Sequence, residues 1–544
     1  MTFPPTRCWD HETAWVAGLA ACASTLAFLI YLRRGDILLY GDAAAHINIA
    51  RRVFDSRTPG LLQLGTVWLP LPHLLMMPFL VSNRMWQSGV GGSIPSMIAY
   101  VLGVVGIFRL VRGVITSSGK SQAAGPTAWF AAAIYGLNPN LLYLQATAMT
   151  ESLYLALFIW AVVHFSEFCH PKRDNAEGWG ADATRSLRNC GLCLAGASLT
   201  RYDGWFVAFT IAGLVILAAW RVNGPRPWRQ ALRFVLIAAT VPGLWFAYNE
   251  IVYRNPMEFA NGPYSAKAIE LKTSVPGFPP HPGTHNLPVA ALYFLKAGEF
   301  SVAEDGWQRV WLLLALLSTV MLAWHDRRMA ALLLLWLPVP FYMLSVAYGG
   351  VPIFTPAWWP RSLYNIRYGV QLLPAFAVFL AMAAYYGASF AHTTTAKRIV
   401  EVVAVAFVAA SYAGVWRGGP ECFHEALVNS RSRLQLEGQL ADKLREFPPE
   451  STFLMYLGEH VGALQDAGIP LHRAINEGNH RVWKQPSDPE GLWERTLADP
   501  GQHADYVVMF AGDVVWEAVH DRNLPVVATI VVSGQRTATI LQAR

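Results

Sequence analysis

The chain has 544 residues, of which 54% are hydrophobic and only 14% charged, and its mean hydropathy is +0.30. Soluble domains carry roughly a quarter charged residues, so this composition predicts an integral membrane protein with some soluble parts. The formal charge of +6 is small for this length, and the arginines lie in short clusters between apolar runs. That pattern suits contact with membrane lipids and argues against nucleic acid as a partner.

Apolar runs close to the roughly 20 residues needed to cross a bilayer recur along the chain. They lie at about 13–32, 93–112, 124–138, 145–166, 186–200, 203–220, 231–249, 308–324, 329–348, 366–390 and 399–416. The sequence therefore predicts a polytopic α-helical membrane protein with about eleven transmembrane helices.

The connections between these runs predict the orientation. With eleven spans, five basic connections fall on the side of the N-terminus, which the positive-inside rule makes cytoplasmic. The other side then holds the first outer loop (33–92), the long outer loop (250–307), the 349–365 loop and everything after 416. The basic connections contain Arg109, Arg112 and Lys120; Lys172, Arg173, Arg185 and Arg188; Arg221, Arg226, Arg229 and Arg233; Arg327 and Arg328; and Lys397 and Arg398. Five arginines of the first outer loop break the rule, namely Arg33, Arg34, Arg51, Arg52 and Arg57.

The first outer loop places a carboxylate and an imidazole where the first span leaves the bilayer. Asp42 and His46 are four residues apart, so a helix over 42–60 lying on the membrane would present both on one face. The following run, Leu61 to Val81, is apolar but contains three prolines, and we predict a re-entrant or juxtamembrane element.

The composition changes after Trp416. Residues 421–447 have the pattern of a charged amphipathic helix, and strand-like runs follow at 451–457, 505–510 and 525–533. We therefore predict a small α/β domain over 417–544 outside the membrane part at 1–416. This domain shows no catalytic constellation, which suggests a role in positioning an acceptor or in packing over the active site.

Several short motifs, in a fixed order, carry a resemblance. They are GDAAAHINIARRVFDS at 41–56, VWLPLPH at 67–73, LNPNLLYLQATAMTESLYLAL at 137–157, TRYDGWF at 200–206 and NIRYGVQLLPAF at 365–376. Together they resemble bacterial members of the GT-C superfamily, related to protein O-mannosyltransferases and lipid A aminoarabinose transferases. The resemblance covers about residues 1–416 and implies a GT-C fold.

The resemblance also implies an activity. These enzymes take a sugar from a polyprenyl-phosphate carrier on the extracytoplasmic side and invert its anomeric centre, using an acid in the first outer loop. Asp42 matches that acid by position. Protein mannosyltransferases usually carry an Asp-Glu pair there, whereas this chain has Asp42-Ala43, so a protein acceptor is less well supported than a lipid or a glycan. The implied location is a bacterial inner membrane, with a cytoplasmic N-terminus and an extracytoplasmic C-terminal domain.

In such a reaction Asp42 would take the proton of the acceptor hydroxyl, and His46 would hold the carboxylate or the acceptor. The alternative is that Asp42 caps the surface helix, where Asp is favoured, and that His46 is a polar surface residue. The departing lipid phosphate needs a cation near the membrane surface, and Arg201, Arg361 and Arg367 lie at predicted outer ends of spans. Each could instead be an interfacial arginine, and Arg201 could pair with Asp203.

Glu151 is predicted about two turns inside its span, where a carboxylate needs a cavity or a partner. It could orient Arg201, bind sugar hydroxyls or join a metal site. Trp68 and His73 could stack on a sugar or pack the lipid carrier. No obligatory metal or other cofactor is predicted, with a divalent metal as an alternative.

A second function class is a transporter or flippase of a lipid-linked substrate. Such proteins usually have paired halves and acids near the middle of several spans, whereas the polar candidates in this chain gather at outer ends. A third option, a non-enzymatic scaffold, would leave Asp42, Glu151 and Arg201 without a role. The sequence therefore favours a hexosyl- or pentosyltransferase that uses a polyprenyl-phosphate sugar.

Overall fold

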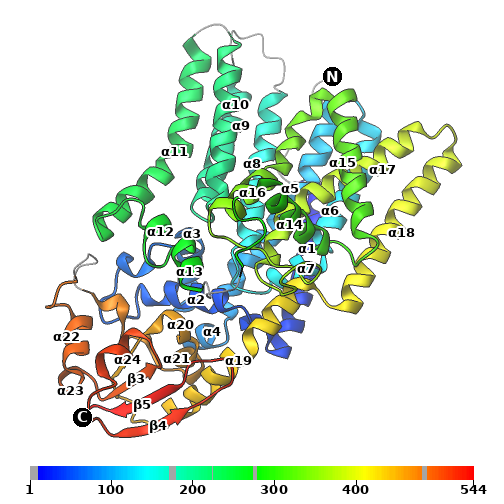
Figure 1. The fold of residues 1–544 in the computed structure, drawn as a ribbon. Coiled ribbons are helices and arrows are strands. Elements are labelled where there is room, and N and C mark those ends of the chain that lie inside the picture. The colour runs from blue at the N-terminus through cyan, green and yellow to red at the C-terminus, as the bar shows by residue number, and fades with distance from the viewer. Residues whose placement is uncertain (1–9, 171–178, 223–224, 274–278, 481–486) are drawn as a thin grey trace.

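The protein consists of a bundle of long helices with a small mixed domain at one end, as a computed structural model shows (Figure 1). The structure describes residues 10–170, 179–222, 225–273, 279–480 and 487–544. The N-terminal helix begins at the end of the bundle far from the C-terminal domain (Figure 1). The molecule is a multi-pass membrane protein, as its composition predicts.

Long helices build the bundle. The first, α1 (His11–Arg34), starts where the Asp10 carboxylate accepts a 2.9 Å hydrogen bond from the Thr13 backbone N–H, and it ends at Gly35 with φ +76°. The others are α5 (Val90–Ser117), α6 (Ser121–Gly136), α8 (Glu151–Cys169), α9 (Ala181–Ser198), α10 (Asp203–Trp220), α11 (Pro225–Tyr253), α15 (Gln308–His325), η3 with α16 (Arg327–Trp336 and Pro338–Tyr348), η4 with α17 (Ile366–Leu372 and Leu373–Phe390) and α18 (Thr394–Gly418).

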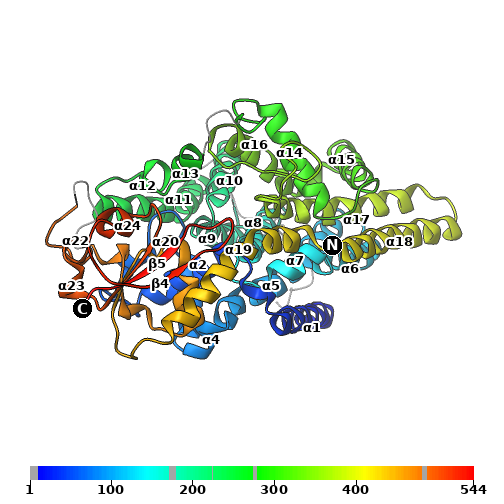
Figure 2. The same ribbon diagram turned by 60° about the horizontal axis from the view of Figure 1, so that its bottom comes forward.

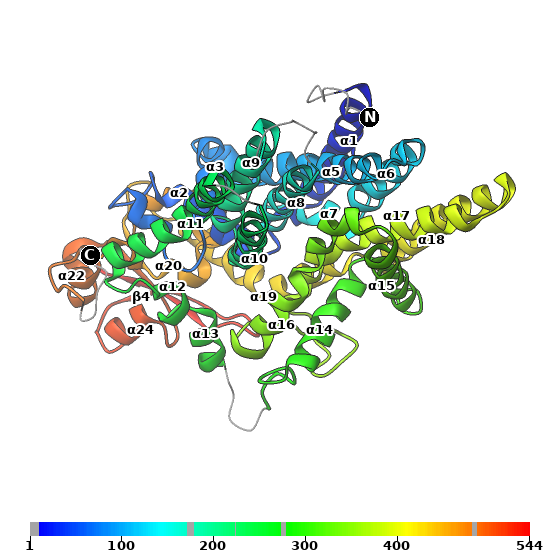
Figure 3. The ribbon, with the colours of Figure 1, turned by 90° about the horizontal axis from the view of Figure 1, so that it is seen from above.

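Within the described residues, nine segments are long and apolar enough to cross a membrane, against the eleven predicted. The two that fall short are helices of the bundle all the same. Helix α6 has only 16 residues, and α9 carries three charged side chains along its first half. Apolar side chains of α18, which extends away from the rest of the bundle (Figure 3), are exposed and suit contact with lipid, among them Ile399, Val402, Val403 and Val405.

Ion pairs place several basic connections at the same end as the N-terminus. Arg112 contacts Asp10 and Glu12 of the N-terminal segment, and Lys120 contacts Asp326 before η3. The Tyr386 hydroxyl near the end of α17 also donates to Asp326. The α5–α6, α15–η3 and α17–α18 connections thus share one end of the bundle, as the charge pattern predicted.

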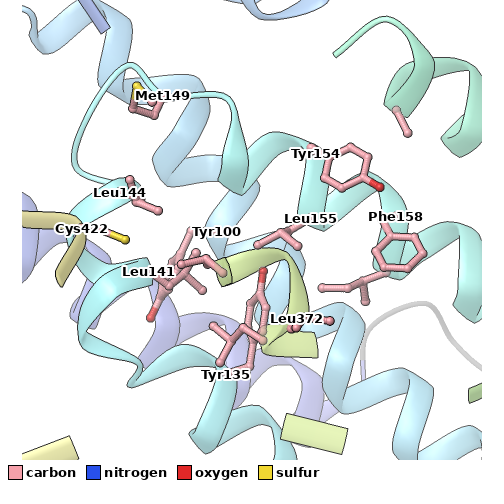
Figure 4. Close-up of a cluster of buried hydrophobic side chains, with 14 of the residues drawn as sticks. Tyr100, Tyr135, Leu141, Leu144, Met149, Tyr154, Leu155, Phe158, Leu372 and Cys422 are labelled. Atoms are coloured by element: carbon pink, nitrogen blue, oxygen red, sulfur yellow. The ribbon is translucent and has the colours of Figure 1, made fainter. Parts of the chain in front are cut away.

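The bundle core is aromatic and tightly packed, as Figure 4 shows. Tyr100 of α5, Tyr135 of α6 and Tyr154 and Phe158 of α8 are fully buried there, and the last two rings stack with centroids 5.9 Å apart. Cys422, from the start of the C-terminal region, reaches the same cluster (Figure 4). Burying so many rings fixes the relative positions of the helices that end at the site.

A layer of short helices covers the end of the bundle opposite the N-terminus. The first outer loop contributes η1 (Asp36–Leu38), α2 (Gly41–Arg52), η2 (Leu61–Leu64), α3 (Leu71–Leu80) and α4 (Asn83–Gln87). Helix α3 has only 10 residues, too few to span a bilayer, which agrees with the juxtamembrane element predicted at 61–81. The layer also contains α7 (Pro139–Leu144), α12 (Glu258–Asn261), α13 (Ala266–Thr273) and α14 (Leu287–Phe300).

The C-terminal region begins with the predicted amphipathic helix, α19 (Glu421–Leu444), and continues into a five-stranded sheet of order β2-β1-β3-β5-β4. The strands are β1 (Phe453–Met455), β2 (Ala474–Ile475), β3 (Tyr506–Phe510), β4 (Val526–Ile530) and β5 (Ala538–Gln542). β1, β2 and β3 are parallel, whereas β5 is antiparallel to β3 and β4. The remaining helical segments are α20 (Leu457–His460), α21 (Gly462–Ala467), η5 (Leu471–Arg473), η6 (Glu477–Asn479), α22 (Leu492–Ala498), α23 (Pro500–His503) and α24 (Val514–Val519). Strand-like runs predicted β1, β3 and β4, but not β2 or β5.

Alternate residues of the sheet pack into two different cores. Val508 and Phe510 of β3 belong to the large core that continues into the bundle, whereas Val507 and Met509 belong to a small core under α22 and α24. Figure 2 shows α19, α20 and α2 beside the sheet. The C-terminal region therefore shares a continuous core with the membrane part.

Candidate active site

Six charged side chains from distant parts of the chain meet where the bundle contacts the C-terminal region. Sequence analysis selected all but the last of them. They are Asp42 of α2, Glu151 of α8, Arg201 between α9 and α10, Asp203 of α10, Arg367 of η4 and Glu425 of α19. We refer to these six residues as the charged cluster.

Local structure explains three of the four carboxylates. Asp42, Glu151 and Asp203 each lie in the first turn of a helix, where unpaired backbone N–H groups favour a negative charge. Glu151 is the first residue of α8, so the prediction that it lies two turns inside a span is wrong. The helix begins later than the apolar run because residues 145–150 form a turn after α7.

Arg367 is the centre of the cluster. Its Nη2 lies 2.5 Å from Asp42 Oδ2, its Nη1 lies 3.0 Å from Glu425 Oε1, and its Nε lies 3.6 Å from Glu151 Oε1. Glu425 also accepts a 3.1 Å hydrogen bond from the Arg367 backbone N–H and one from the Tyr40 hydroxyl. Glu425 is 1% exposed, so this arginine is held by a buried carboxylate from the C-terminal region.

Arg201 is held just as fully by the second half of the cluster. Its Nη1 lies 3.2 Å from Glu151 Oε1, and its Nε lies 3.3 Å from Asp203. Its Nη2 lies 2.9 Å from the Tyr342 hydroxyl. The local pair with Asp203 and the contact with Glu151 were both considered from the sequence. The Tyr368 ring lies between the two arginines, with each guanidinium carbon 5.0 Å from its centroid.

These contacts leave the two arginines little capacity for a further anion. The cluster contains four carboxylates and two guanidinium groups, so the carboxylates outnumber the positive charges. Glu151 Oε2 is buried without a hydrogen-bond partner among the described residues. Arg201 and Arg367 thus hold carboxylates in this structure, and their binding of a phosphate stays a prediction.

Asp42 is the member of the cluster that faces open space. Its side chain is 38% exposed, and it lines a cavity of about 980 Å³. This is near the top of the range of about 300–1,000 Å³ that is usual for ligand sites. The wall comes from α2 and the loop after it, from the segment after α11, and from the C-terminal region, and it includes Ala45, Arg52, Trp68, Arg254, Tyr264, Glu437, Tyr456 and Glu459.

A second group consists of His46 and His73, which are buried behind this wall, and of Trp68, which is part of it. His46 Nδ1 and His73 Nε2 are 2.9 Å apart, and the His46 ring packs on Trp68 with centroids 4.7 Å apart. Both histidines are buried, and burial, reinforced by Arg201 and Arg367, lowers the pKa of His46 to about 3. Burial also lowers the pKa of His73. These imidazoles are therefore neutral.

The structure pairs His46 with His73. The sequence offered two alternatives for His46, a residue that holds the Asp42 carboxylate or the acceptor, and a polar surface residue, and each is wrong in part. His46 makes no contact with Asp42 among the described residues, because its ring points to α3, and it is not a surface residue because it is 3% exposed. Arg361 is exposed in the 349–365 loop, and among the described residues its guanidinium has no ion-pair partner. The charged cluster does not include it.

Sequence analysis missed three residues of this region. Glu425 lies on a helix whose charged pattern predicts a solvated surface, and only its spacing from the buried Cys422 and Ala426 indicates that it faces inward. Arg52 and Arg254 line the cavity with Asp42. Arg52 was noted only as an exception to the charge rule, and Arg254 follows a span directly, with φ +59°.

No group of three or more His, Cys, Asp and Glu side chains that could hold a metal ion occurs in the described part of the chain. The charged cluster itself pairs its carboxylates with arginines.

Comparison with protein-family models and with curated proteins finds no match to the sequence. Among solved structures, ArnT from Cupriavidus metallidurans is similar in the apo state, with a TM-score of 0.55 and 14% identity over 98% of each chain. The same figures hold for ArnT bound to undecaprenyl phosphate. The match to an oligosaccharyltransferase of Archaeoglobus fulgidus, in complex with Zn and sulfate, covers 91% of this chain and 68% of that protein, with 13% identity and a TM-score of 0.48.

The likeness to ArnT extends over nearly the whole of both chains, so this protein is a polytopic membrane protein of the GT-C fold. More particularly, its fold is ArnT-like, including the C-terminal region. The fold predicted from the motifs is confirmed. At 14% identity the likeness describes the fold and not the reaction.

Proposed function

We propose that the protein is an inverting glycosyltransferase that moves a sugar from a polyprenyl-phosphate carrier to an acceptor hydroxyl, with Asp42 as the general base. One observation carries the proposal: Asp42 faces a ligand-sized cavity in an ArnT-like fold, and Arg367 holds its carboxylate from behind. ArnT binds undecaprenyl phosphate, which supports the same class of donor. The sugar would be a hexose or a pentose, and the acceptor a lipid, a glycan or a protein.

The reaction needs few groups. The acceptor oxygen attacks the anomeric carbon as Asp42 takes its proton, and the bond from that carbon to the phosphate oxygen breaks. Arg367 uses one oxygen of the Asp42 carboxylate, so the other is available to the acceptor. Glu151, Arg201, Asp203 and Glu425 would act as positioning residues, with no obligatory cofactor.

The leaving phosphate gains charge and needs cations that are not already held by several carboxylates. Arg254 suits this role because it is exposed on the cavity wall at the end of α11, with no ion pair among the described residues. Arg52 lines the same cavity and has a single ion pair with the residues that the structure describes, at 3.3 Å with Glu477. We propose these two, with Arg361 as a third candidate, in place of Arg201 and Arg367. Trp68, which also lines the cavity, would contact the sugar or the carrier.

We further propose that the cavity opens on the extracytoplasmic face of a bacterial inner membrane, with the N-terminus in the cytoplasm. The five basic connections support this orientation through the positive-inside rule. Single cysteines introduced at Ser118 and Ser533 would test it in a cysteine-free background. A membrane-impermeant maleimide should label only Ser533→Cys in intact cells, and the opposite pattern would reverse the orientation.

The activity is tested by sugar release from radiolabelled polyprenyl-phosphate hexoses and pentoses with purified protein. Asp42→Asn should lower turnover at least about 100-fold while donor binding survives, as expected for loss of a general base. Asp36→Asn is the matched control, because Asp36 belongs to the same loop but pairs with Arg34 at 2.7 Å and does not line the cavity. Equal turnover in Asp42→Asn would exclude Asp42 as the general base. Donor binding without turnover in the wild type would favour the transporter.

A further inference from the structure

One wall of the cavity beside Asp42 has no role in the donor site proposed above. This wall belongs to the C-terminal region, and we call it the domain wall; it consists of Arg433, Glu437, Tyr456, Leu457, Gly458, Glu459, Val461, Gly462, Glu477, His480 and Ser487. The opposite wall, from α2 and from the segment after α11, carries Asp42 and the two arginines proposed for the phosphate. A transferase must hold two substrates, and a cavity of about 980 Å³ with two chemically different walls offers a place for each.

The charges of the two walls differ. The domain wall has three glutamates against one arginine, whereas the opposite wall balances Asp42 and Glu258 with Arg52 and Arg254. Ionised carboxylates only accept hydrogen bonds, so the domain wall suits a ligand that donates them and repels one that is negatively charged. A phosphorylated or carboxylated acceptor is therefore disfavoured there.

Glu459 is the carboxylate that this wall leaves most open. Glu437 is held by Arg433 at 2.6 Å, and Glu477 by Arg52 and by the Leu457 backbone N–H. Among the described residues, the Glu459 carboxylate has an ion pair only with Arg536, at 3.8 Å, and the two side chains are about half exposed, at 46% and 48%. Glu459 is thus free to accept hydrogen bonds from a ligand.

Aromatic rings and glycines complete the site. Tyr264, from the segment after α11, and Tyr456, from the domain wall, are joined through their hydroxyl groups. Tyrosine faces pack on the C–H faces of sugar rings, while nearby acceptors bind the hydroxyls. The Gly462 backbone lies close to the end of the Glu437 side chain. Carboxylates, tyrosine rings and backbone close to the cavity are groups that suit the binding of an uncharged carbohydrate.

We propose that the domain wall is the acceptor subsite and that it takes an uncharged carbohydrate. The proposal rests on the function proposed above, since it assigns the second substrate of that reaction. The acceptor would lie against Tyr456 and Glu459 and present one hydroxyl to Asp42.

Binding of acceptor without donor tests this directly. The full-length protein in detergent is titrated calorimetrically with mannohexaose, arabinohexaose and galactohexaose, and separately with a galacturonate hexamer, a serine-rich peptide and a phosphorylated glycolipid. At least one uncharged hexaose should bind, and Glu459→Gln and Tyr456→Ala should each weaken it about 10-fold or more, the size of one lost hydrogen bond to a charged group.

Two controls guard against misfolding. Tyr456→Phe keeps the ring and should keep most of the binding, and Glu517→Gln removes a glutamate of α24 that does not line the cavity. Preference for the galacturonate, the peptide or the glycolipid would overturn the proposal, as would no binding of any hexaose. If a hexaose binds but no polyprenyl-phosphate sugar is used, the proposed function fails and the site stands. If donors are used and no hexaose binds, only this inference fails.

Discussion

Glu425 shows how far the site depends on a single buried side chain. It holds Arg367 through both the guanidinium and the backbone, and Arg367 holds Asp42. Glu425→Gln removes the charge but keeps the size, so the hydrogen bond to the guanidinium weakens and Asp42 loses its fixed orientation. A loss of about 1.5–3 kcal/mol is usual for such a bond, and we expect kcat to fall about 10- to 100-fold with little change in the donor KM.

Glu421→Gln is the matched control for Glu425. It lies one turn earlier on α19, where its carboxylate contacts only His424 at 3.9 Å. Steady-state kinetics over a range of pH would separate positioning from folding, because a displaced base also alters the pH profile. A fall in kcat as large in Glu421→Gln as in Glu425→Gln would refute the positioning role.

Two of the three arginines predicted from the sequence to bind phosphate, Arg201 and Arg361, should respond differently to replacement by lysine. Lysine keeps the charge but lacks the planar fork that contacts Glu151, Asp203 and Tyr342 at once. Arg201→Lys should cost about 1.5–3 kcal/mol of stability, read as a lower thermal midpoint in detergent. Arg361→Lys, at an exposed position, should stay within about 0.5 kcal/mol of the wild type. If Arg361→Lys instead abolishes turnover without changing the thermal midpoint, Arg361 binds the donor.

At the scale of elements, the packing of α2 on α3 through His46 and His73 should make stability depend on pH. The pKa of His46 is lowered to about 3 in the folded protein and lies near 6.5 when unfolded. Between these values the unfolded state binds more protons, so the free energy of unfolding falls as the pH falls below about 6.5. From pH 7.5 to 5.5 the loss is about 1.4 kcal/mol for His46 alone, and His73 adds to it.

Thermal midpoints of the wild type and of His46→Gln at these two pH values measure the effect. The variant cannot titrate at position 46, so its midpoint should fall less on acidification. His392→Gln, at an exposed position between α17 and α18, is the control and should behave as the wild type does. An equal fall in His46→Gln would show that other groups carry the acid sensitivity.

The elements also show what the sequence could predict. The apolar runs predicted the helical bundle, and the order of the short motifs predicted the fold. Both predictions were possible because they use local sequence patterns of 5 to 25 residues. Asp42, Glu151, Arg201, Asp203 and Arg367 were selected one by one because charges at the ends of spans are costly unless used. Their joining into one cluster was not predictable, since Asp42 and Arg367 are 325 residues apart. Glu425 was missed because an amphipathic pattern assigns every glutamate to the solvated face.

At the scale of the whole molecule, three of the five arginines that broke the charge rule, Arg51, Arg52 and Arg57, serve the contact between the first outer loop and the C-terminal region. Arg52 pairs with Glu477, and Arg57 donates to the Thr452 hydroxyl. Arg51 pairs with Asp55, which in turn accepts from the His472 backbone N–H. These contacts give a reason for their position that does not require the orientation to be reversed.

The same contacts predict that the C-terminal region cannot be removed without loss of the base. Asn48 of α2 donates to Gln465 at 2.7 Å, and Gln465 donates to the Trp86 carbonyl. Deleting residues 447–544 keeps Asp42, Arg367 and Glu425 but removes these partners of Asn48 and Asp55, and each lost hydrogen bond usually costs about 0.5–3 kcal/mol. We therefore expect hydrogen exchange over residues 41–64 to rise at least about 10-fold and turnover to be lost, while α15 keeps its protection. If the C-terminal region were instead a separable module, residues 41–64 would stay protected after the deletion, and donor hydrolysis would continue without the acceptor. That result would contradict the prediction.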